Sequence, residues 1–310
     1  MNLAFYPQSY IPPFWLRGGH AQTVYAKFLT SPAPHYRREL LADSHGEDQV
    51  AYDFVDAPNP NAPLVVLFHG LEGSSHSHYA IELMKAVQAR GWHGVVAHFR
   101  SCGGVPSGRL YHSGDTREMG HMLSLLRQRY ERIYAVGVSL GGNALAKYLG
   151  EQREHAIPHA AAVVSAPIDL NAAGAALGQG IAKRLYTPYF LRTLLTKVPP
   201  KANWQCRSLH DFDDAYTAPM HGFRDAVDYY TQCQCKPFLR DIVRPTLLLN
   251  AKNDPFLPAA HLPTQDEVSG SVHLLQPEQG GHVGFVSGTG RGHLRWLPET
   301  VLDFFVSSAA

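Results

Sequence analysis

The chain has 310 residues, of which 45% are hydrophobic and 17% are charged, and its formal net charge is +1. This length exceeds the usual size of one compact domain, but it suits an α/β fold in which one continuous sheet carries an insertion. The near-neutral charge gives no sign of a polyanionic partner, so we expect no binding to nucleic acid.

The N-terminal part of the chain predicts an arm followed by a hairpin. Residues 1–13 contain neither a basic region nor an apolar run, so they predict neither a signal peptide nor a membrane anchor. The aromatic and polar segment 15–23 is irregular, and we expect it to pack as an N-terminal arm. Two strand-like runs, 36–41 and 49–55, flank a polar turn and predict an antiparallel hairpin.

From residue 64 onward, apolar strand-like runs alternate with segments of helical periodicity. The predicted strands of this region are 64–68, 94–99, 133–138 and 160–166. Asp115 and Glu118 have the spacing of a capping box, which predicts a helix that begins there and continues to about Tyr130. Such alternation is typical of a mostly parallel sheet with helices on both faces.

The pattern changes after Pro167. Residues 170–210 contain no Asp or Glu but carry Lys183, Arg184, Arg192, Lys197, Lys201 and Arg207. Within them, an amphipathic helix is predicted by the apolar stripe Phe190, Leu191, Leu194, Leu195 and Val198. We interpret residues 170–240 as a helical lid inserted after the sixth strand, between core segments 1–169 and 241–310. The basic side of the lid is either a solvated face or a surface for anionic lipid.

The sheet resumes after the insertion. Residues 245–250 and 272–275 predict the last two strands, which brings the sheet to eight. Pro298 fits the first turn of a final helix whose inner side carries Val301, Leu302 and Phe305.

Ser139 lies at the most informative turn of the chain. The strand-like run 133–138 is followed within a few residues by helical spacing, with Gly137 two positions before the serine and Gly141 two positions after it. A strand that reverses so sharply strains its middle residue, and glycines remove the side chains that would collide. This context predicts a nucleophile elbow, although small residues around a serine are also ordinary turn composition.

A serine hydroxyl needs a base and a group that orients the base. Asp254 follows a predicted buried strand, and His282 lies in a glycine-lined loop after the next strand. The chain order Ser139, Asp254, His282 is that of one class of serine hydrolase. Asp169, after the preceding strand, is an alternative acid, and Asp254 could instead be a turn or capping residue.

An oxyanion hole needs backbone N–H donors. The loop from His69 to Gly73 follows a predicted strand, and we expect the N–H groups of Leu71 and Leu140 to form the hole. The alternative is a plain strand-to-helix turn. We expect His69 to brace this loop and not to act as a base.

The sequence indicates neither a metal nor a cofactor. His76 and His78 have a spacing found in some zinc sites, but no further ligand pattern completes it. Cys102 lies in a loop that could border the site, and the favoured interpretation is a small buried thiol. Cys233 and Cys235 lack Cys-x-x-Cys spacing, and the low cysteine content favours reduced thiols in a cytoplasmic protein.

With these residues in view, the chain resembles the YheT-like (AB hydrolase 4) family of α/β-hydrolases from about Trp15 to Phe305. The motifs that carry the resemblance are His69-Gly70-Leu71-Glu72-Gly73-Ser74, Phe99-Arg100-Ser101-Cys102-Gly103-Gly104, Gly137-Val138-Ser139-Leu140-Gly141-Gly142-Asn143, Phe212-Asp213-Asp214-Ala215-Tyr216-Thr217-Ala218-Pro219 and His221-Gly222-Phe223. The resemblance implies carboxylic ester hydrolysis with Ser139, Asp254 and His282 as the triad. Some eukaryotic relatives act on phospholipids or transfer acyl groups to alcohols, and those often carry an N-terminal membrane segment that is not predicted here.

The sequence therefore predicts a serine esterase or lipase-like hydrolase that forms an acyl-enzyme on Ser139. Its expected partners are small-molecule or lipid esters, and its expected state is a monomer or small homo-oligomer. Peripheral lipid contact through the lid stays an alternative to a solvated lid face. Two alternatives stay open: transfer of the acyl group to an alcohol by the same triad, and a binding protein of hydrolase fold without turnover. Hydrolases of this fold that use an aspartate nucleophile are disfavoured by Ser139.

Overall fold

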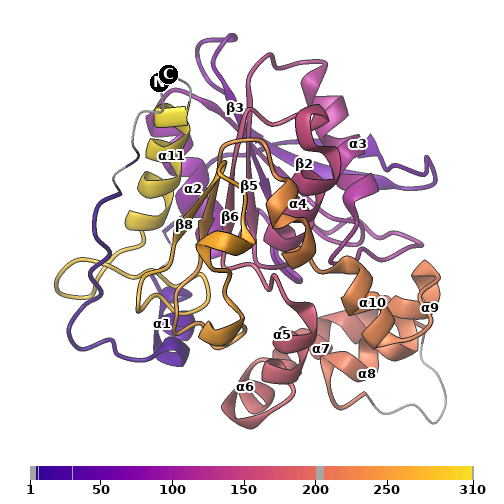
Figure 1. Cartoon of the computed structure of the whole chain (residues 1–310). Coiled ribbons are helices and arrows are strands. Elements are labelled where there is room, and N and C mark those ends of the chain that lie inside the picture. Colours follow the sequence, from indigo (N-terminus) through magenta and orange to yellow (C-terminus); the bar gives the residue numbers. More distant parts are fainter. Residues whose placement is uncertain (1–4, 6, 30, 200–205, 309–310) are drawn as a thin grey trace.

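The structure, a computed structural model, describes residues 5, 7–29, 31–199 and 206–308. Lys201 of the predicted basic stretch lies outside the described residues. A sheet of eight described strands crosses the molecule in the order β1-β2-β4-β3-β5-β6-β7-β8 (Figure 1). The strands are Arg37–Ala42 (β1), Gln49–Val55 (β2), Leu64–Phe68 (β3), His93–Ala97 (β4), Ile133–Val138 (β5), Ala160–Val164 (β6), Thr246–Leu249 (β7) and Val272–Leu275 (β8).

Strand directions agree with the sequence pattern. β1 pairs with β2 antiparallel, as the predicted hairpin, and β2 pairs antiparallel with β4. All other neighbours, from β4 to β8, run parallel. The predicted mostly parallel α/β sheet is confirmed.

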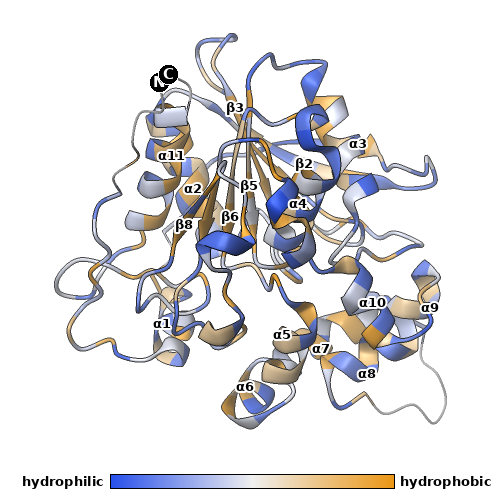
Figure 2. Ribbon diagram, in the orientation of Figure 1, coloured by the Kyte–Doolittle hydropathy of each residue, from blue (hydrophilic) through white to orange (hydrophobic). Residues whose placement is uncertain are grey.

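Helices cover both faces of the sheet because its inner strands are apolar on both sides. Val65 and Leu67 of β3 belong to the core on one face, whereas Val66 and Phe68 belong to the core on the other. Figure 2 shows the hydrophobic colouring along the central strands. The first face is covered by α2 (His78–Ala89) and α11 (Trp296–Ser308), and the second by α3 (Thr116–Arg127) and α4 (Leu140–Gln152).

The predicted capping box at the start of α3 is only half present. The Asp115 carboxylate accepts the Glu118 N–H at 3.3 Å, as an N-cap does. The Glu118 carboxylate instead turns inward, where it accepts the Ser44 N–H at 2.9 Å and pairs with buried Arg100. A buried guanidinium needs carboxylate partners, so the ion pair takes the side chain that would otherwise have completed the box.

Residues between β6 and β7 form a group of short helices with a core of their own. These are α5 (Leu170–Leu177), α6 (Gly180–Leu185), α7 (Thr187–Leu194), α8 (Leu209–Phe212), α9 (Ala218–His221) and α10 (Ala226–Cys233), joined in part by the single turns η2 (Leu195–Lys197) and η3 (Asp213–Thr217). Phe190, Leu191 and Leu194 of the predicted stripe are buried. The helix ends at Leu194, earlier than predicted, and Leu195 is exposed because the following turn is a 3-10 turn, which points side chains in other directions.

Short helical elements complete the chain outside this group. They are α1 (Gly19–Ala26), η1 (Arg153–His155), η4 (Lys236–Asp241), η5 (Ala259–His261) and η6 (Gln265–Glu267). Figure 1 shows that α1 and α6 both lie along the lower edge of the molecule, beyond the carboxyl ends of the parallel strands. In parallel α/β sheets this edge is where functional residues gather.

The turn between β5 and α4 packs against the turn after β3 with no room for a side chain. A Cβ placed on Gly141 would collide with Phe68 O and would lie 2.6 Å from His69 O. A Cβ on Gly70 would lie 3.1 Å from the Cβ of Ser139. Glycines at these two positions therefore allow the two strand ends to meet.

Substitution of Gly141 by Ala should disrupt this contact, because backbone atoms on both sides would have to move. We expect the free energy of unfolding to fall by about 3 kcal/mol, measured by urea denaturation. Gly108→Ala is the matched control, since its Cβ would meet only Asp48 Oδ2, at 3.8 Å. Equal stability of the two variants would contradict the described packing.

Candidate active site

Ser139 occupies a strained backbone conformation at the junction of β5 and α4. Its φ is 54° and its ψ is −119°, a combination that non-glycine residues adopt rarely. Two backbone hydrogen bonds maintain this conformation. The Ser139 N–H donates to Val164 O at 2.8 Å, and the Ser139 C=O accepts the Asn143 N–H at 3.0 Å. The result is a hydroxyl that projects from the edge of the sheet, as predicted for a nucleophile elbow.

His282 and Asp254 meet Ser139 in one hydrogen-bond chain. His282 Nε2 lies 2.9 Å from Ser139 Oγ, and His282 Nδ1 lies 2.9 Å from Asp254 Oδ2. A carboxylate only accepts hydrogen bonds, so Nδ1 carries the imidazole proton and Nε2 is left to accept the serine hydroxyl. Both side chains of the His–Asp pair are buried. The three residues come from the ends of β5, β7 and β8, and the structure brings them together.

Phe256 was not identified from the sequence, although it contacts both Asp254 and His282. Its N–H donates to Asp254 Oδ1 at 2.8 Å. Its ring stacks on the His282 imidazole, with 3.8 Å between ring centroids and 13° between planes. Phe256 therefore fixes the plane of the imidazole, and its aromatic face lies where a positive charge would form on His282. A stack of this kind depends on loop conformation, which the sequence pattern does not reveal.

The loop after β3 lies directly beside the elbow. Leu71 and Leu140 both line the same cavity as Ser139. The Leu140 N–H is in the first turn of α4, where helix geometry leaves it without an acceptor inside the helix. Glu72, the residue after Leu71, has a φ of 55°, and its N–H donates to the Tyr111 hydroxyl at 2.7 Å. The predicted oxyanion donors thus lie on the two turns that meet at Ser139.

His69 braces this loop. Its Nδ1–H donates to Gly70 O at 2.8 Å, and its Nε2 accepts the Phe99 N–H at 3.2 Å. Burial lowers the pKa of His69 to about 3. Both ring nitrogens are therefore occupied by backbone groups of two strand ends, which leaves no nitrogen to act as a base for Ser139.

The N-terminal arm supports the loops that carry Asp254 and His282, a role that the sequence did not indicate. Gln22 Oε1 accepts the Gly280 N–H and the Asn253 side-chain amide, each at 2.9 Å. Thr23 Oγ1 accepts the His282 N–H at 2.8 Å. Helix α1 thereby joins the loop that carries Asp254 to the loop that carries His282. Local sequence pattern does not mark this role, because the partners of Gln22 and Thr23 lie 258 and 259 positions away.

Two cavities open at Ser139 on different sides. One, of about 110 Å³, is mainly apolar and is enclosed largely by the helices between β6 and β7. The other, of about 370 Å³, is more polar and lies toward α1 and α2, with Lys27, His76 and His282 among its lining residues. Leu71, Ser139, Phe190 and Phe256 line both cavities. The hydroxyl thus stands between an apolar and a polar compartment.

An ion pair ties the helical insertion to the loop after β3. Lys197 Nζ lies 2.6 Å from Glu72 Oε1, and the same oxygen accepts the Tyr111 hydroxyl at 3.0 Å. Lys197 Nζ also lies 3.5 Å from Cys102 Sγ. Burial raises the pKa of the Cys102 thiol to about 12, in keeping with a small buried thiol. The ion pair spans 125 positions, so sequence spacing could not predict it.

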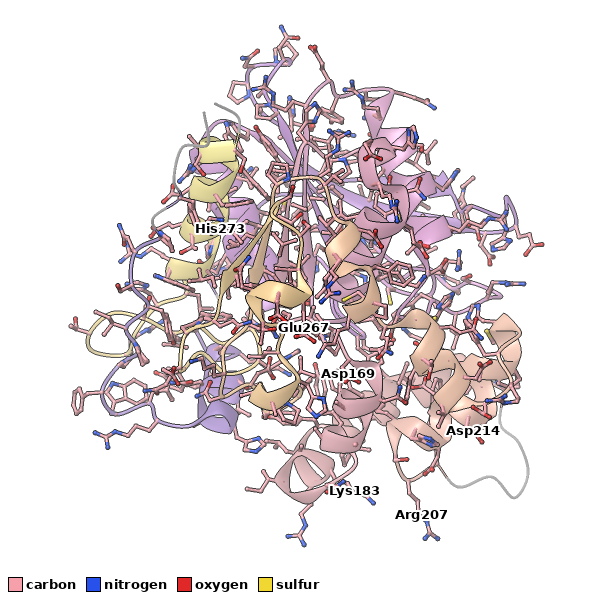
Figure 3. All side chains as sticks on the ribbon, in the orientation of Figure 1. Asp169, Lys183, Arg207, Asp214, Glu267 and His273 are labelled. Carbon is pink, nitrogen blue, oxygen red and sulfur yellow. The ribbon has the colours of Figure 1, made fainter. Side chains whose placement is uncertain are left out.

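Asp169, the predicted alternative acid, takes no part in the hydrogen-bond chain of Ser139, His282 and Asp254. Its Oδ1 accepts the Ala172 N–H as the N-cap of α5, and its Oδ2 pairs with His261 at 3.1 Å. Figure 3 shows the side chain above α5, at the base of the insertion. His78, the second member of the weak zinc pattern, donates from Nε2 to Val283 O at 3.0 Å. In the described part of the chain, no three His, Cys, Asp or Glu side chains gather as metal ligands.

The sequence of this chain is similar to that of known proteins. A family model described as the alpha/beta hydrolase fold matches residues 63–289. The protein YheT of Escherichia coli (strain K12), named as an inferred esterase, is 36% identical over 318 residues, which cover 96% of this chain and 93% of that protein. Phospholipase ABHD3 of Homo sapiens is 27% identical, over 91% of this chain and 74% of its own length. The last two strand-end loops, with Asp254 and His282, fall within the matched region.

Solved structures show the same fold. The esterase Est1E from Butyrivibrio proteoclasticus aligns with a TM-score of 0.59 at 15% identity, over 89% of this chain and 99% of that chain. Among the described residues, every helix is too short or too polar to cross a membrane. The cytoplasmic location and the monomeric or small oligomeric state expected from the sequence stay predictions.

Because His69 is buried and neutral, the free energy of unfolding should fall as the pH is lowered. The unfolded chain binds a proton on this imidazole below about pH 6.5, whereas the folded chain resists it down to about pH 3. Stability from His69 is therefore complete above pH 6.5 and is lost as the pH falls toward 3. Between pH 7 and pH 5, wild type should lose about 2 kcal/mol more unfolding free energy than His69→Gln.

Denaturant titrations at the two pH values measure this difference, with His76→Gln as an exposed control. NMR titration of wild type gives a second readout that does not need a folded variant, and His69 should stay neutral at pH 5. A protonated His69 at that pH, or parallel stability losses in wild type and His69→Gln, would rule out its bracing role.

Proposed function

The chain belongs to the α/β-hydrolase fold family and, within it, to the YheT-like branch, and on that premise we propose that it is a serine hydrolase that cleaves carboxylic esters. The observation that carries the proposal is the unbroken chain from Ser139 Oγ through His282 to Asp254, with 2.9 Å at each step. This order of nucleophile, base and orienting acid is what acyl transfer by a serine requires. The esterase and phospholipase names of its relatives support the same reaction class.

In the acylation step, Ser139 Oγ bonds to the acyl carbon while its proton passes to His282 Nε2. The carbonyl oxygen becomes an oxyanion, to which the N–H groups of Leu71 and Leu140 donate. The ester C–O bond then breaks, and the imidazolium gives its proton to the departing alkoxide. The acyl group is left as an ester on Ser139.

Deacylation repeats these steps with water. The proton of the water passes to His282 Nε2 as the water oxygen attacks the acyl carbon. The bond to Ser139 Oγ then breaks, and the imidazolium gives this proton to Ser139 Oγ, which releases the carboxylic acid and restores the hydroxyl. Asp254 holds the imidazole in the tautomer that can accept a proton, and Phe256 presents its ring face to the imidazolium that forms in each half-reaction. An alcohol in place of water would give acyl transfer, and the ratio of ester to acid products with added alcohol separates the two outcomes.

Residues 170–240 are proposed as the lid of this site, between core segments 1–169 and 241–310. More than half of the residues that line the 110 Å³ cavity come from this segment, and they include the apolar side chains of Leu177, Phe190, Leu194, Phe212 and Tyr230. An apolar compartment suits the acyl chain of a lipid or small-molecule ester, because burial of its methylene groups is favourable. The more polar 370 Å³ cavity on the other side of Ser139 suits the alcohol part.

Replacement of Ser139 by Ala should lower kcat on a chromogenic ester by about 10⁵- to 10⁶-fold, because the acyl-enzyme can no longer form. Covalent labelling by a fluorophosphonate probe should be lost as well. Ser124→Ala, at an exposed serine on α3, is the matched control and should keep both signals. Near-normal esterase activity of Ser139→Ala would refute the assignment.

A further inference from the structure

Helix α6 exposes apolar side chains where a solvated helix would expose polar ones. It buries Ala182 and the following Tyr186, while Ile181 is 63% exposed and Leu185 is 43% exposed. These two exposed residues are four positions apart, so they share one side of the helix. Single exposed apolar residues are common, but adjacent ones on one face indicate a surface that binds something.

Exposed apolar side chains also occur on α7 and just after α1, two elements that contribute residues to the wall of the 370 Å³ cavity. Tyr189 of α7 is 49% exposed and lines that cavity. The ammonium of Lys27, at the end of α1, lies 3.9 Å from the centre of the Tyr189 ring. Phe28, the next residue, is 75% exposed. We call Phe28, Ile181, Leu185 and Tyr189, together with Lys183 and Arg184, the rim.

Charge on both sides of the rim has one sign. Residues 170–210, which contain α6 and α7, include no Asp or Glu, and neither do residues 1–38, which contain α1. Lys183 and Arg184 lie between the two exposed apolar residues of α6, and Figure 3 shows Lys183 projecting away from the sheet. The chain as a whole has a net charge of only +1, so the positive charge is concentrated at this edge.

We propose that the rim docks on the surface of an anionic lipid membrane and places the polar cavity over the lipid esters there. Apolar side chains would enter the boundary between headgroups and acyl chains, while Lys183 and Arg184 would contact lipid phosphates. The proposal rests on the proposed ester hydrolysis for its purpose and names the source of the substrate. A protein partner would need shape and hydrogen-bond complementarity, whereas this mixture of apolar and basic side chains without acids fits a lipid surface.

Sedimentation with vesicles tests the docking surface directly. The full chain with Ser139→Ala, which leaves lipid intact, should bind vesicles of phosphatidylcholine with phosphatidylglycerol more tightly than vesicles of phosphatidylcholine alone. The double change Ile181→Ser with Leu185→Ser should weaken binding to both, by at least about tenfold for the anionic vesicles. Lys183→Glu with Arg184→Glu should weaken binding to anionic vesicles by about tenfold or more.

Matched controls use exposed side chains away from the rim. Val306→Ser, on α11, and Arg132→Glu, before β5, should bind as the parent does, since both are exposed at other parts of the fold. The proposal is wrong if the parent stays in the supernatant with anionic vesicles, or if the rim variants bind as well as the controls. It is also wrong if light scattering gives the mass of a dimer for the parent and of a monomer for the rim variants, because a second copy would then cover the rim.

The rim variants with Ser139 intact should hydrolyse a short, soluble ester at the wild-type rate, because none of their changed residues lines either cavity. This measurement separates the two proposals. Turnover of the soluble ester without vesicle binding would overturn the docking surface alone. Absence of turnover in wild type would overturn the proposed reaction. Vesicle binding would still decide the docking surface, because it is measured with Ser139→Ala and does not need turnover.

Discussion

The whole site depends on the close contact between the turn after β3 and the turn after β5. Gly70 and Gly141 allow this contact, since a Cβ on either would press on the opposite turn. Their approach places Leu71, Ser139 and Leu140 on the wall of one cavity. It also explains the strained φ of 54° at Ser139, which is maintained by backbone hydrogen bonds to β6 and α4. Backbone strain at this residue is thus compensated by the packing around it.

Further contacts hold Asp254 and His282, the other two members of the proposed triad, in place. Helix α1 joins the Asp254 and His282 loops through Gln22 and Thr23, and Phe256 covers the face of the imidazole. These groups are neutral, so they fix geometry without adding charge beside the base. In the proposed mechanism, a fixed orientation of the imidazole between Ser139 and Asp254 is what would let His282 serve as base and then as acid.

The sequence was sufficient for the sheet and for the triad candidates because both depend on local pattern. Continuous apolar runs identified the strands, and the carboxyl ends of parallel strands lie at one edge, so Ser139, Asp254 and His282 at those ends were expected to meet. The supporting contacts were missed because they depend on long-range pairing: Gln22 bonds to Gly280 across 258 positions. For Glu118, in contrast, the local pattern was misleading. Its spacing from Asp115 predicted a full capping box, but its carboxylate forms a buried ion pair with Arg100 instead.

The structure of a phosphonate adduct is the most direct test of the proposed mechanism. We expect a bond between phosphorus and Ser139 Oγ, with the phosphoryl oxygen about 2.7–3.1 Å from the backbone nitrogens of Leu71 and Leu140. We also expect an alkyl substituent to lie in the apolar cavity lined by α5 and α7. A phosphoryl oxygen that points away from these two nitrogens, or an adduct on another residue, would contradict the mechanism.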